Sequence, residues 1–284
     1  MDFSLLRRHT LLGLATLALG GCASGGDGAA DHAAADGQAP SLASLPVKVL
    51  MTQGFAEVHR SLEPQLVVPT QAYVDSGNGT VPAVATALAA RLQADAAADV
   101  LVAPRAVMEQ LQSQGVVRRG SLVDVLRTPL AVAVQAGRPV PPIDTAEALR
   151  AALRKARSVA YPSADGSAFV EQKMLPALGI QNEVMLKSIK VFGPQVGALV
   201  ARGDAELGLQ SLSELLLTPG ITIAGLLPAP LAYATVYTAG IAERTHSNAG
   251  AHALLRFYQQ ETAAHDWHGS GWEAVAHKDG SRSD

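Results

Sequence analysis

The sequence predicts an α/β protein in which mostly parallel sheets are flanked by helices. Short apolar segments alternate with amphipathic segments along the chain, and about 230 residues follow a polar N-terminal stretch. Strands that alternate with helices form a mostly parallel sheet with helices on both faces. Two such sheets suit this length better than one.

The predicted strands are short apolar runs such as PVKVLM and ADVLVA, which are typical of buried strands. In chain order they cover residues 46–51, 71–75, 98–103, 128–135, 158–162, 205–211 and 231–242.

The predicted helices carry apolar residues at helical spacing, as Phe55, Val58 and Leu62 do. In one of them Asp144 is expected to be the N-cap, with Glu147 completing a capping box. The helices are expected over residues 52–66, 80–95, 104–115, 144–156, 166–179, 194–203 and 248–261.

The first 44 residues have the composition of an export signal followed by a linker. Residues 1–21 contain Arg7 and Arg8, then an apolar run shorter than the roughly 20 residues that cross a bilayer. The segment LGGC, ending at Cys22, resembles the lipobox of bacterial lipoproteins, which implies cleavage and lipidation at this cysteine. The paired arginines leave both the ordinary and the twin-arginine export route open.

Residues 22–44 consist mainly of Ala, Gly, Asp and Ser, a composition that cannot bury a core, so we expect a flexible linker. The folded part then begins near Leu45, and residues 276–284 form a disordered tail. Ala23, rather than an acid, follows the cysteine, which favours the outer membrane over the inner one for a periplasmic lipid anchor.

The composition and the motif content exclude several classes of protein. With 4% aromatic residues and a net charge of −3, the chain shows no surface for nucleic acid. Cys22 is its one cysteine, so no disulfide or zinc–thiolate site is expected in the mature chain. No nucleophile elbow, zincin motif, P-loop or complete dinucleotide fingerprint occurs. The expectation is therefore a protein that is not an enzyme and that holds no cofactor or metal.

Four strand-to-helix junctions share a neutral polar chemistry. They are MTQGF, VDSGNGT, YPSADGS and the pair GPQVG and GLQS. Ligands of open α/β sheets bind at the carboxyl ends of strands. Helix N-termini there offer free N–H groups that hold a small anion without Lys or Arg. The alternative is that these Ser, Thr and Asn residues are ordinary N-caps.

The blocks ADVLVAPRAVMEQL and VGALVARGDAELGLQSLSELL resemble the molybdate-type periplasmic solute-binding proteins of ABC importers, and the likeness covers residues 46–260. The resemblance implies a type II binding protein whose two lobes are joined by crossovers near residues 127–134 and 228–237. Lobe I would comprise residues 46–127 and 229–275, and lobe II residues 128–228.

The resemblance also implies a ligand site, although this chain departs from its pattern. The family's two serines fall on Gly54 and Asn78, its tyrosine falls on Ser211, and two backbone donors fall near Asp165 and at Val196. With their polar neighbours, the candidate ligand-binding residues are Thr52, Gln53, Gly54, Ser76, Asn78, Ala164, Asp165, Val196, Gln210 and Ser211.

The first hypothesis is capture of a molybdate-like oxyanion for an ABC permease by a monomer that meets the membrane only through its lipid anchor. The alternative is a di- or tricarboxylate, because Gln53, Asn78 and Gln210 offer both donors and acceptors. A carboxylate at Asp165 also disfavours a dianion, since like charges 4 Å apart cost about 4 kcal/mol at an effective dielectric of 20. Import and sensing both remain open.

Overall fold

A computed structural model describes residues 45–77, 79–94, 98–163, 165–191 and 195–275. The predicted signal peptide, Cys22, the linker, Asn78, Ala164 and the tail lie outside these residues. Within the described ranges, no helix has both the length and the apolar character needed to cross a bilayer.

The strands form one sheet in the order β2-β1-β3-β9-β4-β7-β5-β6, and β8 and β10 both pair with β4. Their bounds are β1 Val47–Thr52, β2 Thr70–Asp75, β3 Val100–Pro104, β4 Val123–Gln135, β5 Val159–Pro162, β6 Ser188–Val191, β7 Leu207–Ser211, β8 Ile221–Leu226, β9 Ala234–Ile241 and β10 Glu273–Ala274.

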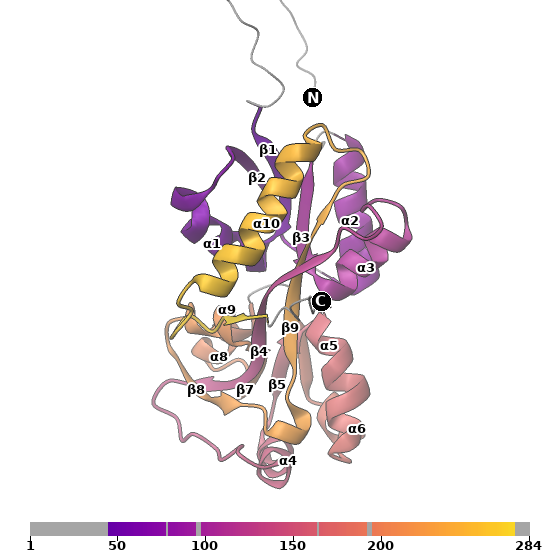
Figure 1. Cartoon of the computed structure of the whole chain (residues 1–284). Helices are drawn as coiled ribbons and strands as arrows, with labels where there is room; N and C mark the ends of the chain where they lie inside the picture. Colours follow the sequence, from indigo (N-terminus) through magenta and orange to yellow (C-terminus); the bar gives the residue numbers. More distant parts are fainter. Residues whose placement is uncertain (1–44, 78, 95–97, 164, 192–194, 276–284) are drawn as a thin grey trace, which may run out of the picture. The chain divides into compact units, whose positions relative to one another are not determined.

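The helices divide between two halves of this sheet (Figure 1). The upper half consists of β1, β2, β3 and β9 with α1, α2, α3 and α10, and the lower half consists of β5 to β8 with α4 to α9. The helix bounds are α1 Gln53–Leu62, α2 Val81–Ala94, α3 Arg105–Ser113, α4 Ala146–Lys155, α5 Asp165–Phe169, α6 Leu175–Ala177, α7 Gln181–Met185, α8 Gln195–Arg202, α9 Leu212–Leu216 and α10 Asn248–Ala264.

Strand β4 belongs to both halves. Its residues 123–129 pair with β9, and its residues 130–135 pair with β7 and β8. The apolar core changes at the same place, because Leu126 packs in a cluster with Phe55 and Tyr258, whereas Leu130 packs with Tyr161. Phe55 and Tyr258 meet edge to face with ring centroids 5.5 Å apart.

The predicted α/β fold is confirmed, with two differences. The expectation of two sheets is wrong, because β4 pairs with strands of both halves and joins them into one sheet. The second difference concerns strand direction. The pairs β1–β2, β1–β3, β5–β6 and β5–β7 are parallel, as expected, but every pairing of β4 and β9 is antiparallel. The sequence analysis missed β6 and β8. Both are short, and most of their side chains are only partly buried, so neither shows a continuous apolar run.

Two helix predictions need correction. The N-cap of α4 is Thr145, not Asp144, because the Thr145 hydroxyl accepts a hydrogen bond from the Ala148 N–H at 3.1 Å. Glu147 then stands one position too early for a capping box. The predicted helix 166–179 is interrupted by a π-helical turn at Val170–Met174. Pro176 follows that turn, and a proline cannot donate to the carbonyl four residues before it.

Asp99 ties the upper half together just before β3. One carboxylate oxygen accepts the Lys48 N–H at 3.0 Å, and the other accepts the Thr245 hydroxyl and the N–H groups of His246 and Ser247 at 2.7–3.0 Å. The side chain is 2% exposed. Burial by itself raises the pKa of Asp99, but these hydrogen bonds outweigh it, so the pKa lies below its ordinary value.

Replacing Asp99 by Asn is expected to lower the free energy of unfolding at pH 7 by about 2–3 kcal/mol, since hydrogen bonds to a charged group contribute about 1.5–3 kcal/mol. A depressed pKa means that the carboxylate stabilises the fold above pH 3.8 and loses that effect as the pH falls through the folded-state pKa. The free energies of unfolding of the wild type and D99N, measured in urea, should therefore converge as the pH falls well below 3.8. The exposed Asp204, replaced by Asn, is the control and should change stability by less than about 1 kcal/mol. An equal gap between wild type and D99N at both pH values would contradict the assignment.

Candidate functional site

A cavity of about 80 Å³ lies where five strands end. Its wall includes Thr52, Pro104, Pro162 and Ser211, which are the last residues of β1, β3, β5 and β7. Ser76 follows β2 directly. Helices α1, α2, α3 and α9 begin at or near the same residues, so several helix N-termini surround the space. This is the edge of the sheet at which the sequence predicts a ligand.

The cavity brings together residues from each of the four predicted junctions. Of the candidate ligand residues, Thr52, Gln53, Gly54, Ser76 and Ser211 line it. Gln210 is buried next to it. Asp165 begins α5, whose next residue, Gly166, is on the wall.

Val196 is placed differently from the other described candidates. It packs with Ala160, Val200 and Ala205 in a small apolar cluster, and its side chain is fully buried there. It is not among the described residues that line the cavity.

Thr52 presents an unused hydroxyl. The residue is 4% exposed, and its Oγ1 has no hydrogen-bond partner within the described part of the chain. Gly77 packs against the other side of this threonine, because a Cβ atom at Gly77 would lie 3.3 Å from the Thr52 methyl carbon. The Asp75 carboxylate fixes this turn by accepting the Gly77 N–H at 3.0 Å. A buried hydroxyl without a partner is costly, so this oxygen is available to a ligand.

Tyr237 occupies the space in front of Gly54. A Cβ atom at Gly54 would lie 1.9 Å from the Tyr237 hydroxyl oxygen, which is far inside van der Waals contact. The Tyr237 ring stacks on Phe55 with centroids 6.1 Å apart and meets Trp272 edge-on at 5.2 Å. The phenol is therefore held at the N-terminus of α1, and position 54 must be glycine.

The segment after α10 packs on the lower half. A Cβ atom at Gly271, where φ is +76°, would lie 2.5 Å from the backbone nitrogen of Ser213 in α9. The next residue is Trp272, and β10 then pairs with β4. Residues 271–274 thus contact both Tyr237 and α9, which carry two walls of the cavity.

Glu214 is a cavity residue that the sequence did not predict. It lines the cavity from the first turn of α9 and accepts a hydrogen bond from the Gln210 amide. Burial raises the pKa of Glu214 above its ordinary value of 4.5, and the hydrogen bond from Gln210 only partly opposes this. The spacing of four residues between Gln210 and Glu214 was visible in QSLSE. An acidic residue near a helix N-terminus, however, is most simply explained by its favourable interaction with the helix dipole.

The electrostatics of the cavity combine neutral donors with one acid. No Lys or Arg occurs among its described lining residues, which include the hydroxyl side chains of Thr52, Ser76 and Ser211. Helix N-termini favour negative charge. Glu214 adds a carboxyl group that can accept or release a proton next to an anion bound in the cavity. The cavity is thus equipped for anion binding and for acid–base chemistry.

Solved structures of binding proteins share this fold. The substrate-binding domain of a putative molybdenum ABC transporter from Clostridium difficile matches with a TM-score of 0.64 and 13% identity, covering 81% of this chain and 99% of that one. The periplasmic molybdate-binding protein of Azotobacter vinelandii matches with a TM-score of 0.53 and 18% identity, covering 77% and 95%. At these identities the likeness concerns the fold.

A curated relative from a Pseudomonas species corrects one expectation. It is 32% identical over 243 residues, which cover 83% of this chain and 92% of the relative, and it is named aconitate isomerase. The expectation that the protein is not an enzyme is therefore overturned. The absence of catalytic motifs did not exclude an enzyme, because general acid–base catalysis requires no diagnostic sequence spacing.

The family model for bacterial extracellular solute-binding proteins matches residues 80–273, which include the N-termini of α2, α3 and α9 around the cavity. With this match over more than half of its length, the chain belongs to the bacterial extracellular solute-binding protein family.

Proposed function

We propose that the protein binds a small polycarboxylate of the aconitate type in the cavity between β1, β2, β3, β5 and β7. The observation that carries this proposal is the Thr52 hydroxyl, which has no partner among the described residues, together with Glu214 on the wall of the same cavity, beside helix N-termini. Hydroxyls and helix N–H groups bind carboxylate oxygens, and a protonated Glu214 donates to one as well. The name of the 32% identical relative points to the same class of ligand.

The geometry at Gly54 favours this ligand over molybdate. The first of the two serines in the molybdate-type proteins corresponds to position 54. A serine has no room there in this chain, because the Tyr237 hydroxyl occupies the space that its Cβ atom would need. Binding of an oxyanion such as molybdate is the competing outcome of the binding test described below.

Entry of such a ligand requires the cavity to widen, since 80 Å³ is well below the 300–1,000 Å³ of drug-sized pockets. We propose that residues 46–127 with 229–275 and residues 128–228 are two lobes that open and close by a hinge in β4 and before β9. The change of core cluster between Leu126 and Leu130 supports this division. We also propose lipid anchoring at Cys22 and delivery of the ligand to an ABC permease.

A second candidate function is isomerisation of the bound acid, which Glu214 and the named relative favour. The Glu214 carboxylate would remove a proton from the methylene carbon of aconitate. The electron pair would delocalise over the double bond and the adjacent carboxylate, which the hydroxyls and helix N-termini stabilise. The same carboxyl would then return the proton to the former vinyl carbon, so that the double bond moves and no oxidant or cofactor is needed.

The binding proposal is tested by thermal unfolding of the full chain with cis- and trans-aconitate, the saturated tricarballylate, molybdate, sulfate and phosphate. At a hundredfold excess over Kd a ligand stabilises the folded state by about 2.7 kcal/mol. For a domain of this size, that corresponds to a rise in Tm of roughly 5–10 °C. We expect this rise with the tricarboxylates. A rise with molybdate alone would contradict the proposal.

Replacing Thr52 by Val is expected to weaken tricarboxylate binding by about 1–3 kcal/mol, or roughly 5- to 150-fold in Kd, because a ligand oxygen loses its donor. The free energy of unfolding without ligand should stay unchanged or rise, since the hydroxyl has no partner within the described residues. Titration calorimetry and urea unfolding measure the two effects. Thr52→Ser keeps the hydroxyl and should bind like the wild type. Equal loss of affinity in both variants would show that the hydroxyl is not the donor.

A further inference from the structure

A second and larger cavity lies at the opposite end of the strands that carry the candidate site. Its volume is about 580 Å³, within the 300–1,000 Å³ of small-molecule pockets. Leu207, at the start of β7, lines this groove, whereas Ser211, at the end of β7, lines the candidate site. At about 3.3 Å per residue, the two positions are roughly 13 Å apart. The groove is therefore a separate space.

Two walls of this groove are apolar. Residues 139–142, with the sequence Pro-Val-Pro-Pro, form one wall between β4 and α4. The other is the face of α4 that carries Ala148, Ala151 and Ala152. The small alanine side chains leave the groove open, and prolines keep the facing segment extended. Such walls accommodate a hydrocarbon body.

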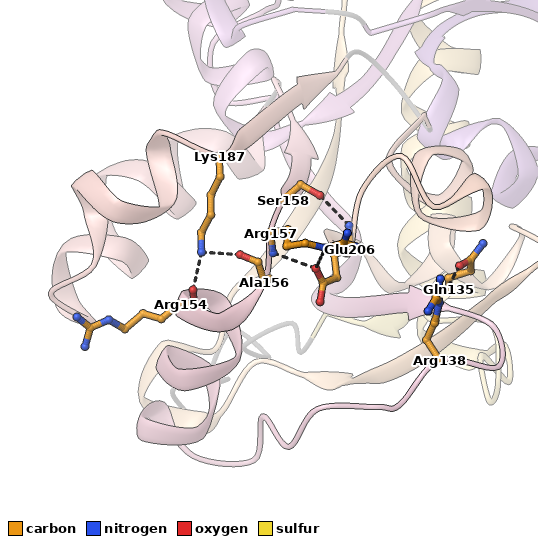
Figure 2. Close-up of polar contacts among 8 residues, drawn as sticks. All are labelled: Gln135, Arg138, Arg154, Ala156, Arg157, Ser158, Lys187 and Glu206. Atoms are coloured by element: carbon orange, nitrogen blue, oxygen red, sulfur yellow. Dashed lines mark hydrogen bonds and ion pairs between the residues drawn. The ribbon is translucent and has the colours of Figure 1, made fainter.

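Several cations around the groove are already engaged (Figure 2). Glu206 accepts the backbone N–H and the Nε–H of Arg157 at 2.9 and 3.1 Å. The Lys187 ammonium donates to the carbonyls of Arg154 and Ala156 at 2.7 and 2.6 Å, which satisfies the C-terminal end of α4. These charges serve the protein itself.

Arg138 and Lys155 have no such engagement. Neither forms an ion pair with a carboxylate in the ranges that the structure describes, although both line the groove. Arg138 Nε donates to the Gln135 side-chain oxygen at 3.3 Å, and the Gln135 amide donates to the Ala201 carbonyl at 3.0 Å. Figure 2 shows Gln135 and Arg138 side by side. Gln135 thus leaves the terminal nitrogens of the Arg138 guanidinium available to an anion.

We propose that this groove binds a monomeric amphipathic carboxylate, with its carboxylate held by Arg138 and Lys155 and its hydrocarbon chain along the proline and alanine walls. The groove complements such a ligand in charge and in apolar surface. Two cations that pair with no carboxylate among the described residues stand beside apolar walls, one in the segment before Pro139 and the other in the last turn of α4. A short free fatty acid carries a charge and an apolar body in this arrangement.

The test is calorimetric titration of the full chain with decanoate below its micellar concentration. Octanoate should bind roughly tenfold more weakly, because two fewer methylenes are buried. Decanol lacks the carboxylate and acetate lacks the hydrocarbon chain, so each should bind at least tenfold more weakly than decanoate. The double variant Arg138→Gln with Lys155→Gln should lose at least tenfold in affinity for decanoate, with an unchanged affinity for decanol. Lys173→Gln, an exposed cation elsewhere, is the matched control and should bind decanoate like the wild type.

Ala151→Glu provides a second check, because its bulky negative side chain fills the groove and, four residues before Lys155, also pairs with that cation, so it should abolish decanoate binding. Three results would overturn the proposal: decanoate binding that survives the double variant, competition between decanoate and a tricarboxylate for one site, or association only with fatty-acid vesicles. Loss of decanoate binding in both the double variant and A151E, with tricarboxylate binding intact, supports it.

Discussion

Glu214→Gln is expected to abolish isomerisation while the ligand still binds. General acid–base catalysis by a positioned side chain contributes about 10²–10⁴-fold, so kcat should fall by that factor. Gln preserves the size of the side chain and a partner for the Gln210 amide, but it takes up no proton. The measurement is exchange of the aconitate methylene hydrogens for deuterium in D₂O, followed by NMR, with calorimetry for affinity on the same samples.

The pH profile separates this role from a structural one. A base must be ionised, and the pKa of Glu214 lies above 4.5 because the carboxyl is buried. Wild-type activity should therefore fall as the pH drops through this raised pKa, and E214Q should show only a pH-independent residual rate. The exposed Glu109, replaced by Gln, is the control and should retain full activity. Unchanged hydrogen exchange in E214Q with intact binding would rule out the acid–base role, and loss of binding without folding damage would make Glu214 a ligand-binding residue only.

Gly54→Ala is expected to destabilise the protein by about 1–3 kcal/mol, the typical effect of overpacking a tight site. The added Cβ atom would lie 1.9 Å from the Tyr237 hydroxyl oxygen and 2.8 Å from the ring carbon that bears it, so the tyrosine must move away from the N-terminus of α1. Since the ring also packs on Phe55 and Trp272, the displacement disturbs the cavity wall as well. Urea unfolding and tricarboxylate titration record the two effects.

A double-mutant cycle identifies the cause. Tyr237→Phe removes the closest atom and should recover part of the stability that G54A loses, which gives a coupling between the two positions. Gly166→Ala is the matched control in the same wall, because its Cβ atom would lie 3.7 Å from the nearest atom, Pro162 Cγ, in ordinary contact. If G54A were as stable as G166A, the close packing of Tyr237 on α1 would be disproved.

The sequence predicted which strand ends meet at the cavity better than it predicted the side chains around it. Thr52, Ser76 and Ser211 line the cavity because strand ends and helix starts follow from local periodicity, and the fold brings those ends together. Glu214 and Tyr237 were missed because their importance depends on burial and on long-range contact. Tyr237 lies in a strand, and only its antiparallel pairing with β3 and β4 brings it in front of Gly54.

The second groove was also beyond sequence reasoning. Arg138 and Lys155 are separated by a proline-rich segment and most of a helix, and nothing in their spacing shows that both face one space. Whether a surface cation has a partner depends on tertiary structure. Arg157 finds Glu206 across 49 positions, whereas Lys155, two residues earlier, pairs with no carboxylate among the described residues.

The packing of residues 271–274 on Tyr237 and α9 has a consequence for biosynthesis. A ribosome makes these residues about 220 residues after Thr52, so the growing chain cannot complete the cavity wall until this segment has been made. The pairing of β3 with β9, which brings Val100 to Ile241, also links distant parts of the chain, and such contacts slow folding. A binding-competent protein therefore arises only after residues 271–274 have been made, and a stop codon as late as position 270 yields a polypeptide without Gly271 and Trp272 and hence without a finished site.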